Sequence, residues 1–291
     1  MQRRDFLGAA ALAPVFLAAD ALATDGSGAV SGLFAALEMQ LGGRLGVAAI
    51  NLETGQQIGH RSGERFPMCS TFKAILAAAI LQRSASDPSL LQRRIRYTEK
   101  DLVPHAPVTE KNIAKGMTVE ELCAATVQYS DNPAANLLMK VLGGPEAVTA
   151  FARSVGDTDF RLDRWETELN SAIPGDPRDT TTPQAMMRTL QALVAGDALP
   201  APQRQQLKDW LVGNTTGGKM IRAGTPAGWT VGDKTGGGAY GARNDIAVIW
   251  PPGKAPIVIA IYTAHAKEDA KYREDIIAGA TRAAIALVAE A

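Results

Sequence analysis

The spacing of apolar residues changes along the chain and predicts where helices and strands lie. Apolar residues from Leu33 to Leu41 recur at helical spacing and predict a helix over residues 31–41. Two strand-like runs follow at 44–52 and 56–61, and the Glu53-Thr54-Gly55 segment between them predicts a hairpin. The first part of the chain is therefore expected to form a helix and then an antiparallel pair of strands.

A long helical region comes next, and strands return only near the end of the chain. Strand-like runs lie at 230–234, 245–250 and 257–263, and a final helix is predicted over 268–289. Proline opens several of the intervening helices, which the first helical turn tolerates. The predicted helices of this middle region are 71–82, 119–128, 133–142, 145–154, 183–195 and 202–210.

A sheet built from both ends of the sequence, with helices inserted between them, is an α+β architecture. We expect one antiparallel sheet flanked by the N- and C-terminal helices, with an all-α domain inserted. The α/β domain is assigned to residues 24–66 and 214–291, and the all-α domain to 67–213. Residues 1–23 are assigned to a cleaved signal peptide.

The N-terminus has the features of an export signal. Arg3-Arg4 precede an apolar stretch from Phe6 to Ala19, and Ala21-Leu22-Ala23 fits a signal peptidase site. The apolar stretch is shorter than the ~20 residues that a membrane span needs, so cleavage is favoured over anchoring. The segment Arg-Arg-Asp-Phe-Leu resembles a twin-arginine signal, which predicts export of the folded protein to the periplasm. No membrane contact is expected after cleavage.

Composition adds little to this picture. The 291 residues are 46% hydrophobic, which suffices for a sizeable core, and 30 basic residues balance 30 acidic ones. A net charge of zero gives no reason to expect a nucleic acid partner, and we expect a monomer that binds a small molecule. The chain has two cysteines, Cys69 and Cys123, which cannot be paired from sequence alone and suit small buried positions.

The first chemical signal is Ser70-Thr71-Phe72-Lys73 at the start of a predicted helix. At this spacing the hydroxyl and the amine share one helix face, so the amine can lie beside the hydroxyl. Backbone N–H groups at a helix start also suit the negative charge that develops on an attacked carbonyl. Alone the motif is weak, since a helix cap with a solvated lysine has the same pattern.

Three further clusters follow in order: Ser130-Asp131-Asn132, then Glu166 with Asn170, then Lys234-Thr235-Gly236. Together the four clusters resemble those of class A serine β-lactamases, whose catalytic motifs are well known. The resemblance runs from about residue 44 to 250. It implies the β-lactamase/penicillin-binding transpeptidase-like fold and the hydrolysis of penicillins and cephalosporins, which gives antibiotic resistance, without a cofactor.

The resemblance assigns a role to each cluster. Ser70 is the nucleophile, and either Lys73 or Glu166 acting through a water is the base that activates it; the sequence leaves both open. Ser130 passes a proton to the lactam nitrogen. Asn132 is implied to contact the substrate's side chain, and Lys234, Thr235 and Arg243 its carboxylate. Gly236 and Gly237 would let their strand approach the ligand closely, and the N–H groups of Ser70 and Gly237 would form the oxyanion hole. His105 stands near the mouth of the cleft, where it would contact the substrate. Plain structural roles are the alternative: turn residues for the Ser-Asp-Asn cluster, a solvated charge for Arg243 and an exposed loop histidine for His105.

Glu166 distinguishes an enzyme from a protein that only binds its ligand covalently, because an acyl-enzyme is hydrolysed only if a water is activated. A carboxylate held with Asn170 can position that water. Arg164 and Asp179 stand at the two ends of a segment rich in Pro, Gly and Asp, and an ion pair between them would close an Ω-type loop. Two separate surface charges are the alternative.

Departures from the family narrow the expectations. In carbapenem-hydrolysing relatives, a cysteine at the position of Cys69 forms a disulfide with a cysteine at the position that is Gly238 here. In other relatives, a cysteine at the position of Cys123 forms a disulfide with one at the position that is Ala77 here. We therefore expect free thiols and weak carbapenem hydrolysis. None of the three histidines has a metal-binding spacing, and there is no Gly-x-Ser-x-Gly motif, so a zinc enzyme and an α/β-hydrolase are disfavoured. A penicillin-binding sensor and a D-Ala-D-Ala peptidase are the remaining rivals, and both lack the loop that carries Glu166.

Overall fold

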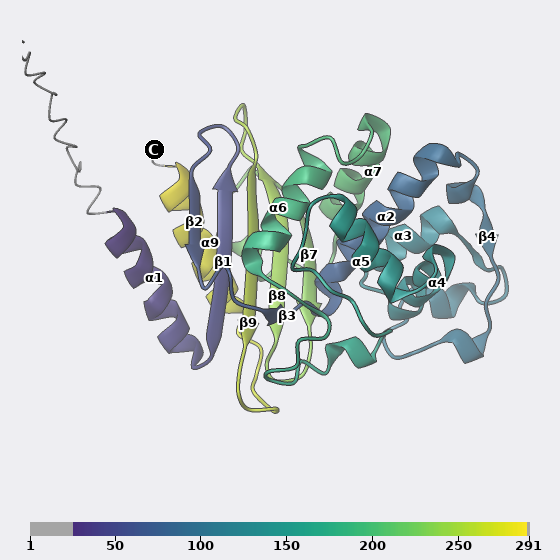
Figure 1. Cartoon of the computed structure of the whole chain (residues 1–291), viewed down its shortest axis with the longest axis horizontal. Coiled ribbons are helices and arrows are strands. Elements are labelled where there is room, and N and C mark those ends of the chain that lie inside the picture. The colour runs from purple at the N-terminus through teal and green to yellow at the C-terminus, as the bar shows by residue number, and fades with distance from the viewer. Residues whose placement is uncertain (1–25, 290–291) are drawn as a thin grey trace, which may run out of the picture.

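The computed structural model describes the backbone of residues 26–289 and the side chains of residues 32–289. Its centre is a five-stranded sheet in the order β2-β1-β9-β8-β7, with every neighbouring pair antiparallel (Figure 1). The sheet thus joins strands from both ends of the sequence, as predicted, and the α+β class is confirmed. The strands are β1 (Arg44–Asn51), β2 (Gln57–His60), β7 (Thr230–Gly237), β8 (Arg243–Trp250) and β9 (Ile257–Ala264).

Both faces of this sheet are covered, which explains the composition of its central strand. All eight residues of β9 are buried, so its sequence IVIAIYTA is apolar almost throughout and does not alternate. One face packs on α1 (Gly26–Leu41) and α9 (Glu274–Ala289) around Phe34, Ile261 and Ile277. The other face packs on α6 (Pro183–Val194), which crosses in front of the sheet in Figure 1.

Helix α2 (Phe72–Ser86) is the centre of the helical part of the molecule. Every residue from Phe72 to Leu81 is buried, and a helix that is apolar all round must be covered by neighbours. Lys73 is the single charge in that buried stretch, so its position there needs a chemical reason. The helices around α2 are α3 (Val119–Gln128), α4 (Asn132–Leu142), α5 (Pro145–Ser154) and α7 (Ala201–Val212).

Helix starts follow local capping chemistry. Thr118 and Glu121 form a reciprocal capping box at α3, and the Asp131 side chain accepts the N–H of Ala134 at α4. At α6 the Thr182 hydroxyl accepts the N–H of Ala185. These caps fix where each helix begins and hence where the residues before it lie.

The remaining elements are short and were not predicted. They comprise β3 (Phe66–Pro67) paired with β6 (Thr180–Thr181), β4 (Arg94–Ile95) paired with β5 (Met117–Thr118), the four-residue α8 (Ile221–Gly224), and the 3-10 helices η1 (Cys69–Thr71), η2 (Leu90–Gln92), η3 (Glu99–Asp101), η4 (Thr109–Asn112) and η5 (Glu168–Asn170).

Several predicted boundaries were wrong. Helix α1 begins at Gly26 and not at 31, α2 ends at Ser86 and not at 82, and β8 begins at Arg243 and not at 245. The last helix begins at Glu274 and not at 268, because two acidic residues, Glu274 and Asp275, occupy its first turn and its buried apolar face starts at Ile276. Strand β7 continues to Gly237, since its ladder with β8 holds as far as the pair Gly237 and Arg243.

Two other expectations concern the N-terminal segment and the domain limits. The signal peptide assigned to residues 1–23 lies outside the described residues, and the domain limits at 67 and 213 stay predictions. Across the described part of the chain, no helix combines the length and the apolar character that crossing a membrane requires.

Candidate active site

Ser70 lies in η1, directly before α2 and against strand β7. Its hydroxyl is 3.3 Å from Oε1 of Glu166. Ser70 is only 8% exposed, so little of it is accessible to solvent. A Cβ on Gly236 would stand 2.8 Å from the carbonyl oxygen of Met68 and 3.2 Å from the backbone nitrogen of Ser70. The strand therefore approaches the serine backbone as closely as glycine alone allows.

The Lys73 ammonium group is buried and reaches several polar groups of the site. Its Nζ donates to the Ser130 carbonyl at 2.7 Å and to Oδ1 of Asn132 at 2.5 Å, and it lies 3.0 Å from Oε1 of Glu166. Burial lowers the pKa of Lys73, and the Glu166 carboxylate opposes that shift. The same carboxylate oxygen thus contacts both the serine hydroxyl and the lysine amine.

Ser130 stands between two lysines. Lys234 Nζ donates to the Ser130 hydroxyl at 3.1 Å, and Lys73 Nζ is 3.5 Å from the same oxygen. Lys234 is fully buried on β7, and burial together with the Lys73 charge lowers its pKa to about 7. This geometry gives the Ser130 hydroxyl two sources of protons.

Glu166 is held at both its backbone and its carboxylate. Asn170 Nδ2 donates to Oε2 at 2.5 Å, which leaves Oε1 for Ser70 and Lys73. Asn136 donates to the Glu166 carbonyl at 2.9 Å and accepts its N–H at 3.0 Å. Asn136 was missed from sequence, although it lies one helical turn after Asn132 on α4 and therefore on the same face.

The loop that carries Glu166 is closed by Arg164 and Asp179. Arg164 Nε is 2.5 Å from Oδ2 of Asp179, which is 1% exposed. Oδ1 of Asp179 accepts the backbone N–H groups of Asp163 at 2.7 Å and Arg164 at 3.0 Å. The two charges therefore meet, and Asp179 also ties the chain at the start of the loop.

Asp131 fixes the segment that carries Ser130 and Asn132, a role missed from sequence. Its buried carboxylate accepts the N–H groups of Val108 and Thr109 at 3.0 and 2.9 Å. The facing loop includes His105, whose ring Nε2 is 3.0 Å from the Tyr129 carbonyl and whose own carbonyl accepts the N–H of Asn132. Asn132 donates to the Pro104 carbonyl at 2.8 Å as well.

The last predicted positions lie along β7 and β8. Thr235 Oγ1 is 2.6 Å from Oγ1 of Thr216, a second residue missed from sequence. Arg243 lies beside Gly237, where an added Cβ would be 3.2 Å from its Nη1. The Arg243 guanidinium is paired with Glu274 and lies 5.1 Å from the Tyr272 ring centre, so it is not a free cation.

The predicted free thiols are confirmed. Cys69 and Cys123 are both buried and unpaired, and burial raises the pKa of each thiol. A Cβ on Gly238 would stand 2.7 Å from the Cys69 sulfur, so a glycine is needed for this close contact. From residue 26 to residue 289, no three His, Cys, Asp or Glu side chains gather closely enough to hold a metal ion.

This arrangement can perform acyl transfer to a serine: a nearly buried hydroxyl lies beside a carboxylate, two lysines flank a second hydroxyl, and a strand of glycines approaches the nucleophile's backbone. The class that fold and site together define is therefore a serine hydrolase built on an α+β scaffold.

Comparisons with known proteins agree with that class. Residues 30–288 match the family described as the beta-lactamase enzyme family. The carbapenem-hydrolyzing beta-lactamase KPC of Klebsiella oxytoca is 58% identical over 253 residues, 87% of this chain and 86% of the relative. The chain belongs to the beta-lactamase enzyme family.

Solved structures agree in detail. A beta-lactamase from Desulfarculus baarsii superposes with a TM-score of 0.89 at 55% identity, covering 92% of this chain and 99% of that one. A variant of the reconstructed last common ancestor of Gram-negative class A beta-lactamases gives a TM-score of 0.86 at 57% identity, covering 88% and 97%. The chain is therefore a class A enzyme of that family.

Proposed function

We propose that this protein hydrolyses the β-lactam amide of penicillins and cephalosporins through an acyl-enzyme on Ser70. The observation that carries the proposal is the position of Glu166, whose Oε1 contacts the Ser70 hydroxyl at 3.3 Å and the Lys73 amine at 3.0 Å. One carboxylate is thus poised beside both the nucleophile and its neighbouring base.

In acylation the Ser70 oxygen attacks the lactam carbonyl carbon, and the C–N bond of the ring breaks. The Ser70 proton moves to Lys73 or, through a water, to Glu166; both routes fit the contacts of Oε1, and neutral Lys73 is favoured by its burial. The Ser130 hydroxyl gives its proton to the departing nitrogen and regains one from a neighbouring lysine. The N–H groups of Ser70 and Gly237 hold the oxyanion.

In deacylation a water attacks the ester carbonyl and restores the Ser70 hydroxyl. Glu166 takes the water's proton and returns it to the Ser70 oxygen as the ester C–O bond breaks. Asn170, which donates to the other carboxylate oxygen, keeps Oε1 aimed at the nucleophile. The ion pair of Arg164 and Asp179 supports this step by holding the loop. Hydrolysis of the ester separates this enzyme from a penicillin-binding sensor.

The substrate carboxylate is assigned to Lys234 and Thr235, with Arg243 contributing through a guanidinium already shared with Glu274. Gly236 and Gly237 are assigned to the approach of the substrate along β7, and Asn132 and His105 to its side chain. The N–H of Asn132 donates to the His105 carbonyl, which supports assigning these two residues to the same part of the substrate. We further propose that the mature protein is a periplasmic monomer exported by the twin-arginine route, with no resident cofactor.

Turnover and labelling together test this proposal. The purified protein should hydrolyse a chromogenic cephalosporin through many cycles, whereas Ser70→Ala should fail to form any penicillin adduct in an intact-mass measurement. Removing a nucleophile that acts with its base costs many orders of magnitude in rate. A single turnover followed by a stable adduct would favour the sensor, and an adduct on Ser70→Ala would exclude Ser70 as the nucleophile.

A further inference from the structure

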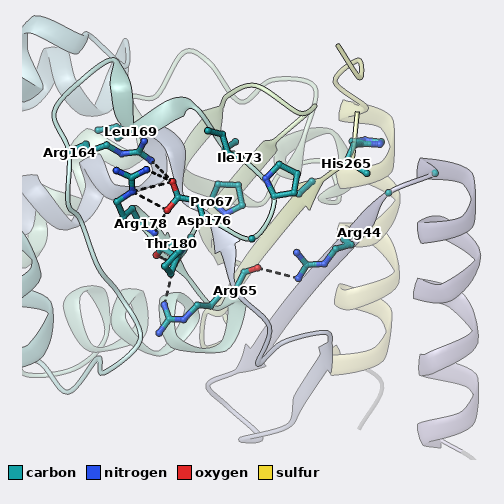
Figure 2. Close-up of a pocket in the computed structure, with 18 residues that line it drawn as sticks. Arg44, Arg65, Pro67, Arg164, Leu169, Ile173, Asp176, Arg178, Thr180 and His265 are labelled. Atoms are coloured by element: carbon teal, nitrogen blue, oxygen red, sulfur yellow. Dashed lines mark hydrogen bonds and ion pairs between the residues drawn. The ribbon is translucent and has the colours of Figure 1, made fainter. Parts of the chain in front are cut away.

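A second cavity lies between the loop that carries Glu166 and the ends of β1 and β9, and its volume is about 370 Å³ (Figure 2). Its walls come from the turn at residues 42–44, the end of β9 at 264–266 and the loop segment 172–178. Neither Ser70 nor Lys234 lines it, so it is distinct from the candidate active site. This volume falls within the range of about 300–1,000 Å³ typical of small-molecule sites.

The lining of this cavity is amphipathic. Pro67, Leu169, Ile173, Pro174 and Pro177 give it an apolar surface. Four guanidinium groups and one carboxylate supply the charge around that surface, so cations outnumber anions among the lining side chains. These charged residues are Arg44, Arg65, Arg164, Arg178 and Asp176.

All four arginines keep some hydrogen-bond donors without a partner among the described residues, and the side chains of Arg178 and Arg44 are the two most exposed of the four. Among the described residues, Arg44 forms hydrogen bonds only through Nη2, to Glu64 at 2.8 Å and the Arg65 carbonyl at 3.2 Å. Arg178 uses Nε and Nη2 toward Asp176 in the same described part of the chain. The Nε and Nη1 groups of Arg44 and the Nη1 group of Arg178 are left, and guanidinium donors suit carboxylates.

Arg44 is the better placed of the two. Figure 2 shows its side chain extending from its strand toward the loop that carries Ile173 and Asp176. The guanidinium lies 4.4 Å from the centre of the Phe66 ring, which supports its orientation from one side. Its side chain is 43% exposed, so a ligand can reach it without first displacing protein atoms.

We propose that this cavity binds a small organic carboxylate with an apolar body, whose anionic group meets Arg44 and whose body packs on Ile173 and the neighbouring prolines. The occupant fills space between the loop and the sheet. It therefore holds residues 172–178 in the conformation seen here, because a ligand that binds only the folded arrangement stabilises it.

The test uses 4-phenylbutyrate as the probe and its uncharged amide as the matched ligand, with affinities from isothermal titration calorimetry. The acid should bind and the amide should bind at least about tenfold more weakly, the factor expected for one charge-assisted hydrogen bond. Arg44→Gln should weaken the acid by a similar factor. Arg93→Gln, which removes an exposed arginine outside the cavity, should leave its affinity unchanged.

Two more variants locate the bound probe. Ala266→Trp, at an exposed position on the cavity wall, should abolish binding by filling the space. Thr235→Val alters the candidate carboxylate site near Ser70 and should leave binding unchanged. Loss of binding in Thr235→Val together with retention in Arg44→Gln would put the probe in the active-site cleft and overturn the proposal.

Hydrogen exchange supplies a readout that does not depend on turnover or on how Ala266→Trp folds. At a 4-phenylbutyrate concentration near its wild-type Kd, exchange of the amides within residues 172–178 should slow in the wild-type protein and much less in Arg44→Gln, which is mostly unoccupied at that concentration. Unchanged exchange in the wild-type protein, equal affinity for acid and amide, or absence of binding by the acid would each refute the carboxylate site.

Discussion

Asp179→Ala is expected to destabilise the protein more than Arg164→Ala, although the two residues form one ion pair. Asp179 is 1% exposed and accepts three groups: Arg164 Nε at 2.5 Å and the backbone N–H groups of Asp163 and Arg164 at 2.7 and 3.0 Å. Removing its carboxylate leaves the two backbone N–H groups without an acceptor and leaves the Arg164 guanidinium with only the more distant Asp176, whose Oδ2 is 3.8 Å from Nη2. Removing the Arg164 side chain leaves Asp179 with two backbone donors that still stabilise its charge.

The magnitudes follow from this asymmetry. Breaking a buried pair costs about 3–5 kcal/mol, and Asp179→Ala should fall in that range because it leaves a guanidinium and two amides without their acceptor. Arg164→Ala should cost about 2 kcal/mol, the value of one hydrogen bond to a charged group. Asp179→Asn retains an acceptor and should lie between them.

Urea unfolding of the single and double variants measures these free energies. The double variant should lose about as much as Asp179→Ala alone, because both substitutions remove one shared interaction. Deacylation of a penicillin adduct should slow in the same order, since the loop positions Glu166. A larger loss for Arg164→Ala than for Asp179→Ala, or fully additive losses in the double variant, would show that the carboxylate does not tie the loop as described.

Two further predictions concern titration and thiols. A substrate carboxylate binds protonated Lys234, whose pKa is about 7, so kcat/KM should fall on the alkaline side with an apparent pKa near that value. Lys234→Arg keeps the positive charge and should move the alkaline fall in kcat/KM to higher pH. If the apparent pKa of that fall does not change, the titrating group is not Lys234. Cys69 and Cys123 should both be alkylated by iodoacetamide after unfolding without reductant, and recovery of a disulfide-linked peptide would contradict the free thiols.

Local chemistry explains which parts of the fold the sequence could predict. The limits of α3 and α5 were predicted to the residue, because Thr118 with Glu121 and Pro145 mark those starts. The end of β7 was missed, since Gly236 and Gly237 have low strand propensity and extend the strand only through the ladder with β8. Short strands such as β3 depend on one partner far along the chain and leave no periodic pattern.

In the site, too, residues within sequence motifs could be predicted, whereas residues that act through tertiary contacts could not. The predicted catalytic residues were found from motif order, and the structure brings Ser70, Lys73 and Glu166 into one cluster. Asn136, Thr216 and Glu274 were missed, because an isolated polar residue gives no indication of the tertiary contact it makes. Arg243 was predicted to contact the substrate carboxylate, and its pairing with Glu274 could not be predicted because it depends on where α9 begins.

The most direct test of the central claim is the fate of the acyl-enzyme in Glu166→Ala. With benzylpenicillin this variant should release a stoichiometric burst and then nearly stop, and intact-mass analysis should find one adduct that peptide mapping assigns to Ser70. Acylation keeps Lys73 and Ser130, whereas ester hydrolysis loses the carboxylate that lies 3.3 Å from the nucleophile. Steady turnover near the wild-type rate without an accumulating adduct would contradict the account, because Glu166 would then not be the base for deacylation.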